Sequence, residues 1–265
     1  MFSIEGLRVF GMGPGDKVTM RGLLRMIPTE NREGFMLVLH DVFRHSSVLA
    51  TDLPVVLPDG RQQRIIHVEA EPEFNEHGNL SGYTGIVQDV TDRRIAEDKI
   101  RHLANFDALT GLPNRRQFEA VLGGQVDRVA RSGEPALLLM LDIDHFKQVN
   151  DRFGHQVGDE VLRYFSKRAA AEMRDTDRLG RYGGEEFLAV LTATEDASSA
   201  HLAAERVRDG VAKHDWGRVA PDLQVTVSLG VAVCQPDESI EQLLARADAA
   251  LYAAKRAGRD CVRMG

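Results

Sequence analysis

The stretch RLGRYGGEEFLAVL at residues 178–191 places two β-rich runs on either side of a Gly-Gly pair. A type I′ turn needs positive φ at both central residues, which Gly183 and Gly184 adopt without strain, so we expect a tight β-hairpin here. Glu185 and Glu186 follow the pair and precede an apolar strand, where adjacent carboxylates are unfavourable unless a cation neutralises them. The alternative is that they form a solvated surface turn.

Around this hairpin, residues 107–265 alternate apolar runs with long helical patterns. The continuous run Ala136–Leu141 is typical of a strand buried on both faces, and Gln224–Val233 predicts a further strand. Helices are expected over Arg115–Ala130, Asp159–Met173, Glu195–Val211 and Ile240–Ala257. Four strands and four helices predict one α/β domain in which helices flank a sheet.

Residues 1–91 have a different pattern, with shorter strands and turns around a helical stretch. Turns of the Asp-Gly and Gly-Asn type between β-rich runs predict an antiparallel meander with helices on one face. The expected helices are Val18–Met26 and Gly34–Phe43, separated by Pro28 and a polar run, and the expected strands are Leu53–Leu57, Ile65–Ala70 and Tyr83–Val90.

Between the two parts, Thr91 or Asp92 can cap a helix with a narrow apolar stripe of Ala96, Ile100 and Leu103. So narrow a stripe suits the seam of a two-stranded helix pair better than a core. At about two heptads, such a helix needs support from the flanking domains. A solvated linker helix is the alternative.

Composition narrows the class of protein. The chain has 265 residues, enough for two domains, and a net charge of −7 that argues against nucleic-acid binding through phosphate contacts. No apolar run approaches the roughly 20 residues of a membrane span, and residues 1–11 lack the layout of a signal peptide. Cys234 and Cys261 are too few for a disulfide framework or a zinc site. We therefore expect a soluble cytoplasmic protein without nucleic-acid or membrane partners.

Carboxylates follow the most apolar strand directly. Asp142 and Asp144 lie two residues apart, so both can project together from the strand end and hold Mg²⁺. With the glutamates of the hairpin they would form the layout of a phosphoryl-transfer site that uses two metal ions. Solvated loop aspartates are the alternative interpretation.

Other polar residues match the parts of a guanine nucleotide. An amide from Asn150 and a fixed carboxylate from Asp159 can satisfy the N–H donors of a guanine edge, although Asp159 could also be only a helix N-cap. Lys255 and Arg259 bracket Gly258 at the end of the last helix. There they suit the helix dipole and could equally hold a triphosphate.

Five motifs occur in a fixed order: DALTGLPNRR at 107–116, the segment Asp142–Asp159, Arg181–Phe187, VSLGV at 227–231, and ADAALYAAK at 247–255 followed by Gly258-Arg259. This order closely resembles the GGDEF family, the diguanylate cyclases, across residues 105–265, with Gly183–Phe187 as the signature in its Glu form. The resemblance implies a palm-like fold similar to polymerases and adenylate cyclases. It also implies a reaction that joins two GTP into cyclic di-GMP and releases two pyrophosphates. Asp260 replaces an Asn often seen in the family, and no consequence for catalysis is expected.

The resemblance also implies roles for individual residues. Asp142, Glu185 and the carbonyl of Ile143 would hold Mg²⁺, with Mn²⁺ as an alternative ion, and Glu185, with Glu186 nearby, would be catalytic. Since each subunit binds one GTP and the product has two-fold symmetry, a homodimer is expected. The implied GTP-binding residues are Phe146 (through its backbone), Lys147, Asn150, Asp159, Gly183, Gly184, Lys255 and Arg259.

Upstream of the signature, Arg174 and Asp177 resemble the family's Arg-x-x-Asp product-inhibition site, and Arg206 resembles a secondary contact to the same ligand. Bound cyclic di-GMP is therefore expected to inhibit the enzyme. A rival interpretation keeps the fold without catalysis, as a receptor for GTP or cyclic di-GMP. A second rival is a scaffold for another protein.

Residues 1–91 resemble a PAS sensor domain through the turn at 57–60, the strand at 82–86 and the exit Gln88–Arg93. By the resemblance, Phe2–Phe10 is expected to be the second PAS strand. Either the first strand is absent, or the chain begins inside a longer sensor. No PAS cofactor is expected. The expected division is a PAS-like domain at 1–91, a signalling helix at 92–106 and a cyclase domain at 107–265.

Overall fold

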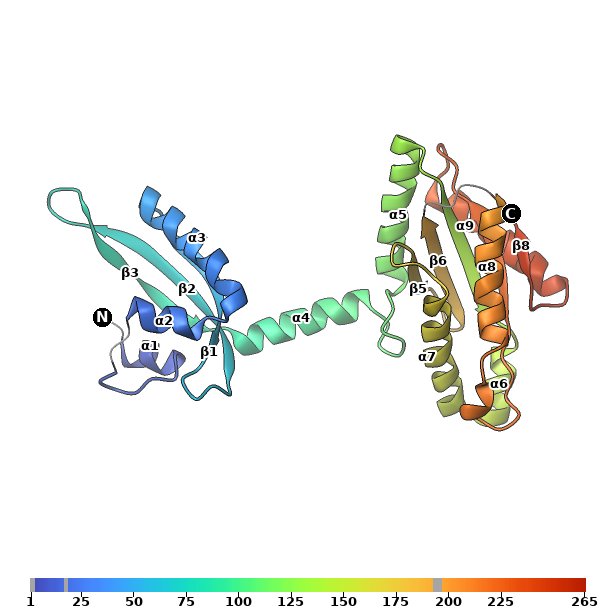
Figure 1. Ribbon diagram of the computed structural model, residues 1–265, viewed down its shortest axis with the longest axis horizontal. Coiled ribbons are helices and arrows are strands. Elements are labelled where there is room, and N and C mark those ends of the chain that lie inside the picture. The colour runs from blue at the N-terminus through green and yellow to red at the C-terminus, as the bar shows by residue number, and fades with distance from the viewer. Residues whose placement is uncertain (1–2, 17–18, 193–196) are drawn as a thin grey trace. The chain divides into compact units, whose positions relative to one another are not determined.

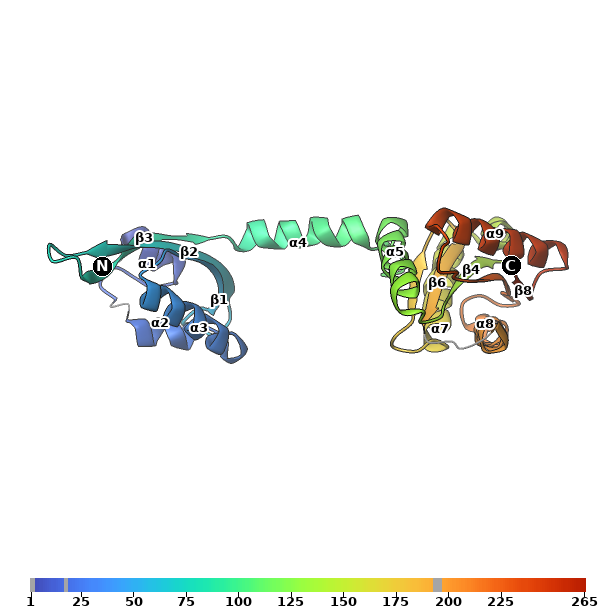
Figure 2. The same cartoon turned by 90° about the horizontal axis from the view of Figure 1, so that it is seen from above.

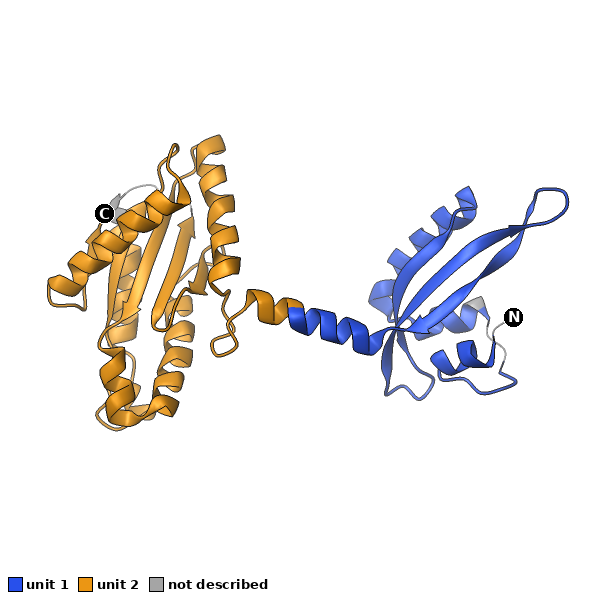
Figure 3. Ribbon diagram, turned by 180° about the vertical axis from the view of Figure 1, so that it is seen from behind, with its two compact units in different colours: residues 1–100 blue, residues 101–265 orange. Residues whose placement is uncertain are grey.

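The computed structural model describes residues 3–16, 19–192 and 197–265, and the chain forms two compact units, Met1–Ile100 and Arg101–Gly265 (Figure 3). Helix α4, Thr91–Asn105, spans the division between them. Among the described residues, no helix is both long and apolar enough to cross a membrane.

The N-terminal unit is a three-stranded antiparallel meander in the order β1-β2-β3, as the turn chemistry predicts. Helices α2 and α3 lie on one face of this sheet (Figure 2). The core beneath them includes Phe10, Ile27, Val55 and Ile66, which are all buried. The elements are α1 (Ile4–Val9), α2 (Met20–Met26), α3 (Thr29–His45), β1 (Leu49–Val56), β2 (Gln63–Phe74) and β3 (Leu80–Asp89).

The expectation of a strand over Phe2–Phe10 is wrong, because the described part of this segment forms helix α1. Ser3 caps the helix by accepting a hydrogen bond from the Gly6 N–H at 3.0 Å. Leu7 and Phe10, three residues apart, are both buried, which matches a helical rather than an alternating pattern. Phe2 lies outside the described residues.

The polar run after Pro28, expected to separate two helices, is instead the first turn of α3. Pro28 occupies the N-cap position of that helix. Proline is tolerated at a helix start because no intrahelical hydrogen bond is lost there.

Helix α4 is present as predicted and begins at Thr91. Within α4, all of which the structure describes, no residue is buried, and the three residues of the expected stripe, Ala96, Ile100 and Leu103, are exposed. Ile95 is exposed beside them. The expected apolar stripe therefore exists and is uncovered in the single chain.

The first turn of α4 is fastened to the sheet of the N-terminal unit. Thr91 Oγ1 accepts the Ile65 N–H at 2.9 Å, and the Arg94 guanidinium pairs with the Asp52 carboxylate. His67 also contacts that carboxylate, with 2.6 Å between Nδ1 and Oδ1. The hydrogen bond from His67, followed by the contacts of Arg94, outweighs burial and lowers the pKa of Asp52. Asp52 thus links two strands to the start of α4.

The C-terminal unit is built on a five-stranded sheet in the order β5-β6-β4-β7-β8, antiparallel except between β7 and β8 (Figure 1). The strands are β4 (Ala136–Ile143), β5 (Arg178–Arg181), β6 (Glu186–Thr192), β7 (Val227–Val233) and β8 (Val262–Met264). The helices are α5 (Arg115–Ser132), α6 (Phe146–Phe153), α7 (His155–Ala171), α8 (Ala197–Ala212) and α9 (Ile240–Arg256), with a short 3₁₀ turn at Trp216–Arg218.

Strand β4 lies at the centre of this sheet, and all eight of its residues are buried, as its continuous apolar run predicts. Its alternate side chains enter two separate cores. Leu139 and Leu141 pack with Phe165 of α7 on one face, whereas Leu138 and Met140 pack with residues of α5 and α9 on the other. The sheet is therefore covered on both sides.

Three details of this unit differ from expectation. The sheet has a fifth strand, β8, whose three residues are too short a pattern to detect. Helix α6 was also not expected, and it spans only eight residues. Helix α7 begins at His155, four residues before Asp159, so Asp159 lies inside the helix and is not its N-cap. Residues 195–196 of the expected helix Glu195–Val211 lie outside the described residues.

A glycine in β7 allows α9 to approach the sheet. A Cβ at Gly230 would lie 2.1 Å from the Ala247 carbonyl oxygen and 2.3 Å from the Leu251 nitrogen, both of α9. We expect Gly230→Ala to lower the free energy of unfolding by about 2–3 kcal/mol, because the helix must shift away from the sheet. Urea denaturation followed by the fluorescence of Trp216, the only tryptophan of the chain, measures this unit.

The control is Gly124→Ala on the exposed side of α5, where a Cβ meets no described atom within 4 Å. This change should stabilise the protein by about 0.5–1 kcal/mol, because alanine favours a helix interior over glycine. Equal denaturation midpoints for the two variants would contradict the close packing of α9 on β7.

Candidate active site

The end of β4 brings together residues from three separate parts of the chain. Asp142 is paired in register with Glu186 of β6 on one side and Ser228 of β7 on the other. Its carboxylate is buried, and Oδ2 lies 2.7 Å from Nζ of Lys255 in α9. The Ile143 N–H donates to the Glu185 carbonyl at 3.2 Å. The structure therefore gathers the predicted metal and catalytic residues at one edge of the sheet.

The carboxylates at this edge are held in an environment that disfavours their charge. Burial raises the pKa of Asp142, and the charges of Glu186 and Asp144 add to this rise against the opposing effect of Lys255. Burial and then the charge of Asp142 raise the pKa of Glu185. A cation placed between them would relieve both effects.

Asp144, the second carboxylate of the expected pair, has a hydrogen-bonding network of its own. It follows the last residue of β4, and the chain then turns through His145, whose φ is 56°. The Asp144 carboxylate accepts hydrogen bonds from Thr226 Oγ1 at 2.8 Å, Ser228 Oγ at 2.7 Å and the Asp260 N–H at 3.1 Å. These three donors satisfy a buried carboxylate, so Asp144 is an anchor between separate segments of the chain.

The Gly-Gly turn also differs from the type I′ geometry expected of it. Positive φ occurs at neither Gly183 nor Gly184, both of which the structure describes. Four residues, 182–185, connect the strands, and the N–H groups of Tyr182 and Gly183 both donate to the Glu186 carbonyl. A Cβ at Gly183 would lie 2.7 Å from Glu186 Oε2, whereas a Cβ at Gly184 would meet no described atom within 4 Å. Glycine at 183 makes room for Glu186, and the surface at 184 is open to a ligand.

An arginine holds this turn in shape. The Arg181 guanidinium donates to the carbonyl of Gly183 at 3.2 Å and to that of Gly184 at 2.7 Å. It also reaches both carboxylate oxygens of Asp107, at 3.0 and 3.1 Å. Burial opposes ionisation of Asp107, but hydrogen bonds from Thr110 and Arg181 outweigh it and lower its pKa. The loop that follows α4 is therefore joined to the turn that carries Glu185.

The two predicted guanine-binding residues lie on adjacent helices. A Cβ at Gly158 of α7 would lie 1.9 Å from Asn150 Oδ1 and 3.3 Å from Phe146 Cζ of α6. Asp159 is the next residue of α7, and it is exposed. The sequence analysis did not single out Gly158. Its position inside a helix could have drawn attention to it, because glycine destabilises a helix interior and is usually found there only where close packing requires it.

The expected phosphate-binding groups lie at two helix ends. Phe146 and Lys147 form the first turn of α6, whose N–H groups have no acceptor within the helix. Lys255 lies in the last turn of α9, and Gly258 follows the C-cap Ala257 with a φ of 113°, as its predicted position requires. Arg259 follows it and is exposed.

The residues that resemble a product-inhibition site lie away from this edge. Arg174 and Asp177 are in the loop between α7 and β5, and Arg206 is an exposed residue of α8. The Asp177 carboxylate accepts the N–H groups of Arg174 and Thr192 at 2.8 and 3.1 Å. Asp177 thereby shapes the loop on which the exposed Arg174 side chain is presented.

Across the described ranges, no three His, Cys, Asp or Glu side chains cluster as a ready-made metal site. Proteins hold Mg²⁺ through one or two carboxylates while substrate phosphates and waters complete its shell. Asp142 and Glu185 are two carboxylates of this kind, and the raised pKa of each would be relieved by a bound cation.

Comparison with known proteins agrees with this geometry. Residues 104–261, more than half of the chain, match the family described as "Diguanylate cyclase, GGDEF domain". The chain belongs to the GGDEF family. The palm-like sheet flanked by helices that the resemblance predicts is confirmed, because the similar solved structures are GGDEF domains.

Two curated relatives illustrate the similarity of this GGDEF protein. The diguanylate cyclase DgcP of Pseudomonas aeruginosa is 42% identical over 160 residues, covering 60% of this chain and 24% of that protein. The response regulator PleD of Caulobacter vibrioides is 43% identical over 170 residues, covering 62% of this chain and 37% of that protein. The chain thus spans about a quarter to two fifths of their lengths.

Among solved structures, the coiled coil and GGDEF domain of DgcB from Caulobacter crescentus, in complex with c-di-GMP, matches with a TM-score of 0.60 and 34% identity. The match covers 66% of this chain and 93% of that one.

The raised pKa of Glu185 leads to a stability prediction. A raised pKa means that the fold disfavours the ionised form, so this carboxylate destabilises the metal-free protein at neutral pH. Glu185→Gln should then raise the free energy of unfolding by about 0.5–1 kcal/mol. The gain should shrink as the pH is lowered, because wild-type Glu185 then becomes neutral as well.

Thermal unfolding in the presence of a chelator, at neutral and at mildly acidic pH, measures this difference. Glu134→Gln, in the exposed loop before β4, is the control and should leave stability unchanged. A Glu185→Gln variant that is less stable than wild type at neutral pH would contradict the electrostatic argument.

Proposed function

We propose that this GGDEF protein is a diguanylate cyclase that condenses two GTP into cyclic di-GMP and two pyrophosphates. The observation that carries the proposal is the meeting of Asp142, Glu185 and Lys255 at the end of β4. Two carboxylates and a cation from distant parts of the chain are the groups that a nucleotidyl transfer needs beside a triphosphate.

In this proposal, Asp142, Glu185 and the Ile143 carbonyl hold Mg²⁺, for which Mn²⁺ is an alternative. When bound, the ion supplies positive charge at the α-phosphate. Glu185, with its raised pKa, accepts the proton of the attacking 3′-hydroxyl, and Glu186 contributes negative charge beside it. The 3′-oxygen attacks the α-phosphorus in line, and pyrophosphate leaves.

The remaining residues bind and orient GTP. Asn150 and Asp159 pair with the guanine edge. Adenine could not satisfy these two side chains, because its hydrogen-bond donors and acceptors are placed differently from those of guanine. The first-turn N–H groups at Phe146 and the side chain of Lys147 bind phosphates at the start of α6. The nucleotide lies close to the backbone of Gly183 and Gly184, where the surface at Gly184 is open. Lys255 and Arg259 neutralise the triphosphate.

We propose that the active species is a homodimer. One site binds one GTP, so the two 3′-oxygens and two α-phosphates of the product must come from two facing sites. The uncovered stripe of α4 at Ile95, Ile100 and Leu103 supports a helix pair that would bring two chains together.

We also propose that the N-terminal unit is a PAS-like sensor that regulates the cyclase. Its sheet and helices enclose an apolar cavity of about 600 Å³, lined by residues such as Leu23, Phe35, Val68 and Tyr83. A change in this unit can reach α4 through Asp52, which contacts Arg94.

The first prediction is that the purified chain converts GTP and Mg²⁺ into cyclic di-GMP and that Glu185→Ala abolishes product formation. Chromatography of the nucleotides measures both, after co-purified product has been removed with a phosphodiesterase. The rate per subunit should fall on dilution through the range in which sedimentation shows dissociation. Binding of GTP without any product would instead favour a receptor.

We propose product feedback at Arg174, Asp177 and Arg206. A forked guanidinium suits the guanine edges and phosphates of cyclic di-GMP, and Arg174 is exposed on a loop that Asp177 holds through the backbone. We expect Arg174→Ala to raise the concentration of cyclic di-GMP needed for half-inhibition at least tenfold, as loss of a charge-assisted hydrogen bond implies.

Initial rates at increasing cyclic di-GMP measure this effect. Arg218→Ala removes an exposed arginine that pairs locally with Asp215, at 3.0 Å, and serves as the control. Unchanged sensitivity of the Arg174 variant would refute the assignment.

A further inference from the structure

The turn between α9 and β8 has an unusual backbone. Three consecutive residues of this five-residue connection, Gly258, Arg259 and Asp260, have φ angles of 113°, 67° and 42°. Glycine adopts such angles freely, but for arginine and aspartate the left-handed region is strained and persists only where the surroundings impose it. Arg259, the middle residue, is the group that the proposed function assigns to the GTP phosphates.

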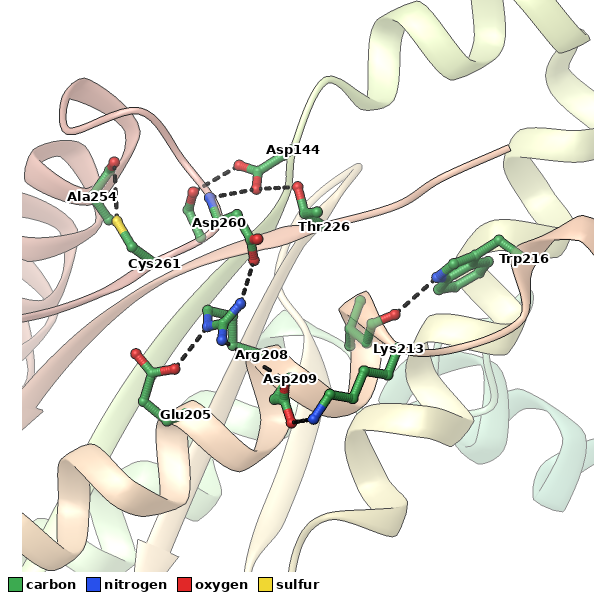
Figure 4. A network of polar contacts seen from close by, with 12 residues as sticks. Asp144, Glu205, Arg208, Asp209, Lys213, Trp216, Thr226, Ala254, Asp260 and Cys261 are labelled. Atoms are coloured by element: carbon green, nitrogen blue, oxygen red, sulfur yellow. Dashed lines mark hydrogen bonds and ion pairs between the residues drawn. The ribbon is translucent and has the colours of Figure 1, made fainter. Parts of the chain in front are cut away.

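Backbone contacts fix one side of this turn. The Arg259 N–H donates to the Ala254 carbonyl at 3.1 Å, and the Asp260 N–H donates to Asp144 Oδ2 at 3.1 Å. Asp144 is itself buried and held by Thr226 and Ser228 (Figure 4). These contacts would be kept whatever side chain stood at position 260.

The side chain of Asp260 makes a different contact, with α8. Arg208 Nη1 donates to Asp260 Oδ1 at 2.8 Å, and Arg208 Nε donates to Glu205 Oε2 at 2.7 Å (Figure 4). Arg208 is largely covered, with 20% of its side chain exposed, against 41% for Asp260. The hydrogen bonds that Arg208 donates to Glu205 and Asp260 raise the pKa of Arg208, so this guanidinium stays charged.

We propose that the Arg208–Asp260 ion pair positions Arg259 for GTP by holding the strained turn against α8. This inference rests on the proposed function. The family resemblance alone gave no consequence to aspartate at 260, where the family often has asparagine. An asparagine would keep an acceptor oxygen but lose the charge, so the pair would hold the turn less firmly.

The expected effect is on nucleotide binding more than on the chemical step. If the turn could relax, Arg259 would sample orientations away from the phosphates. GTP binding would then have to order the Arg259 side chain, and this entropic cost would weaken the affinity for GTP. We expect Asp260→Asn and Arg208→Gln each to raise KM for GTP about three- to fivefold, with kcat within about twofold, as a partly exposed ion pair allows.

The test uses the full chain, treated with a phosphodiesterase, and compares wild type with both single variants and the double variant. Because both changes break one pair, the double variant should be no worse than either single variant. The effect should shrink in high salt, which screens the pair in wild type. Lys213→Gln breaks the exposed Lys213–Asp209 pair at the end of α8, at 2.5 Å, and should leave KM unchanged.

A second measurement separates this proposal from the proposed function. Calorimetric binding of a GTP analogue with a sulfur on its α-phosphate needs no turnover. Weaker binding by the two variants supports the inference even if wild type forms no product. The inference would be overturned if both variants bound the analogue as tightly as wild type and had the same KM. It would also be overturned if the effects of the two changes added up in the double variant. Absence of analogue binding by wild type would overturn both proposals.

Discussion

Strand β4 buries all eight of its residues between two layers of helices, so charged groups can gather only where it ends. Apolar side chains from both cores fill the sheet up to Leu141, and the next residue is an aspartate in register with Glu186. The hairpin, the helix after the strand and the last helix all meet at that point. Because the core fixes the strand, it also fixes the position of the site.

This arrangement has an energetic cost. Asp142 is buried and Glu185 is half-buried near it, and burial raises the pKa of both carboxyl groups. Lys255 offsets part of the effect through its contact with Asp142. Stability is thus reduced at the same edge at which we propose that a cation and a triphosphate bind.

Sequence patterns predicted the parts of the fold that local periodicity determines. The run Ala136–Leu141 indicated the central strand β4. Glu185 and Glu186, which follow Gly183-Gly184, lie at the end of β4 as the motif implied. The failures have tertiary causes. The conformation at Gly183 accommodates its contact with Glu186. The hydroxyl donors to Asp144 come from Thr226 and Ser228, some eighty residues away in the chain, and no local pattern indicates them. Gly158 and Asp260 acquire their contacts in the same way, from segments that periodicity cannot place.

The bonds of Arg181 have a mechanical consequence. One planar group holds the carbonyls of Gly183 and Gly184 together with the carboxylate of Asp107, and the Arg181 N–H bonds the Pro113 carbonyl at 2.9 Å. The loop that leaves α4 and the turn that carries Glu185 are therefore cross-linked through a single side chain. A displacement of that loop would pull on the turn through Arg181 rather than through the sheet.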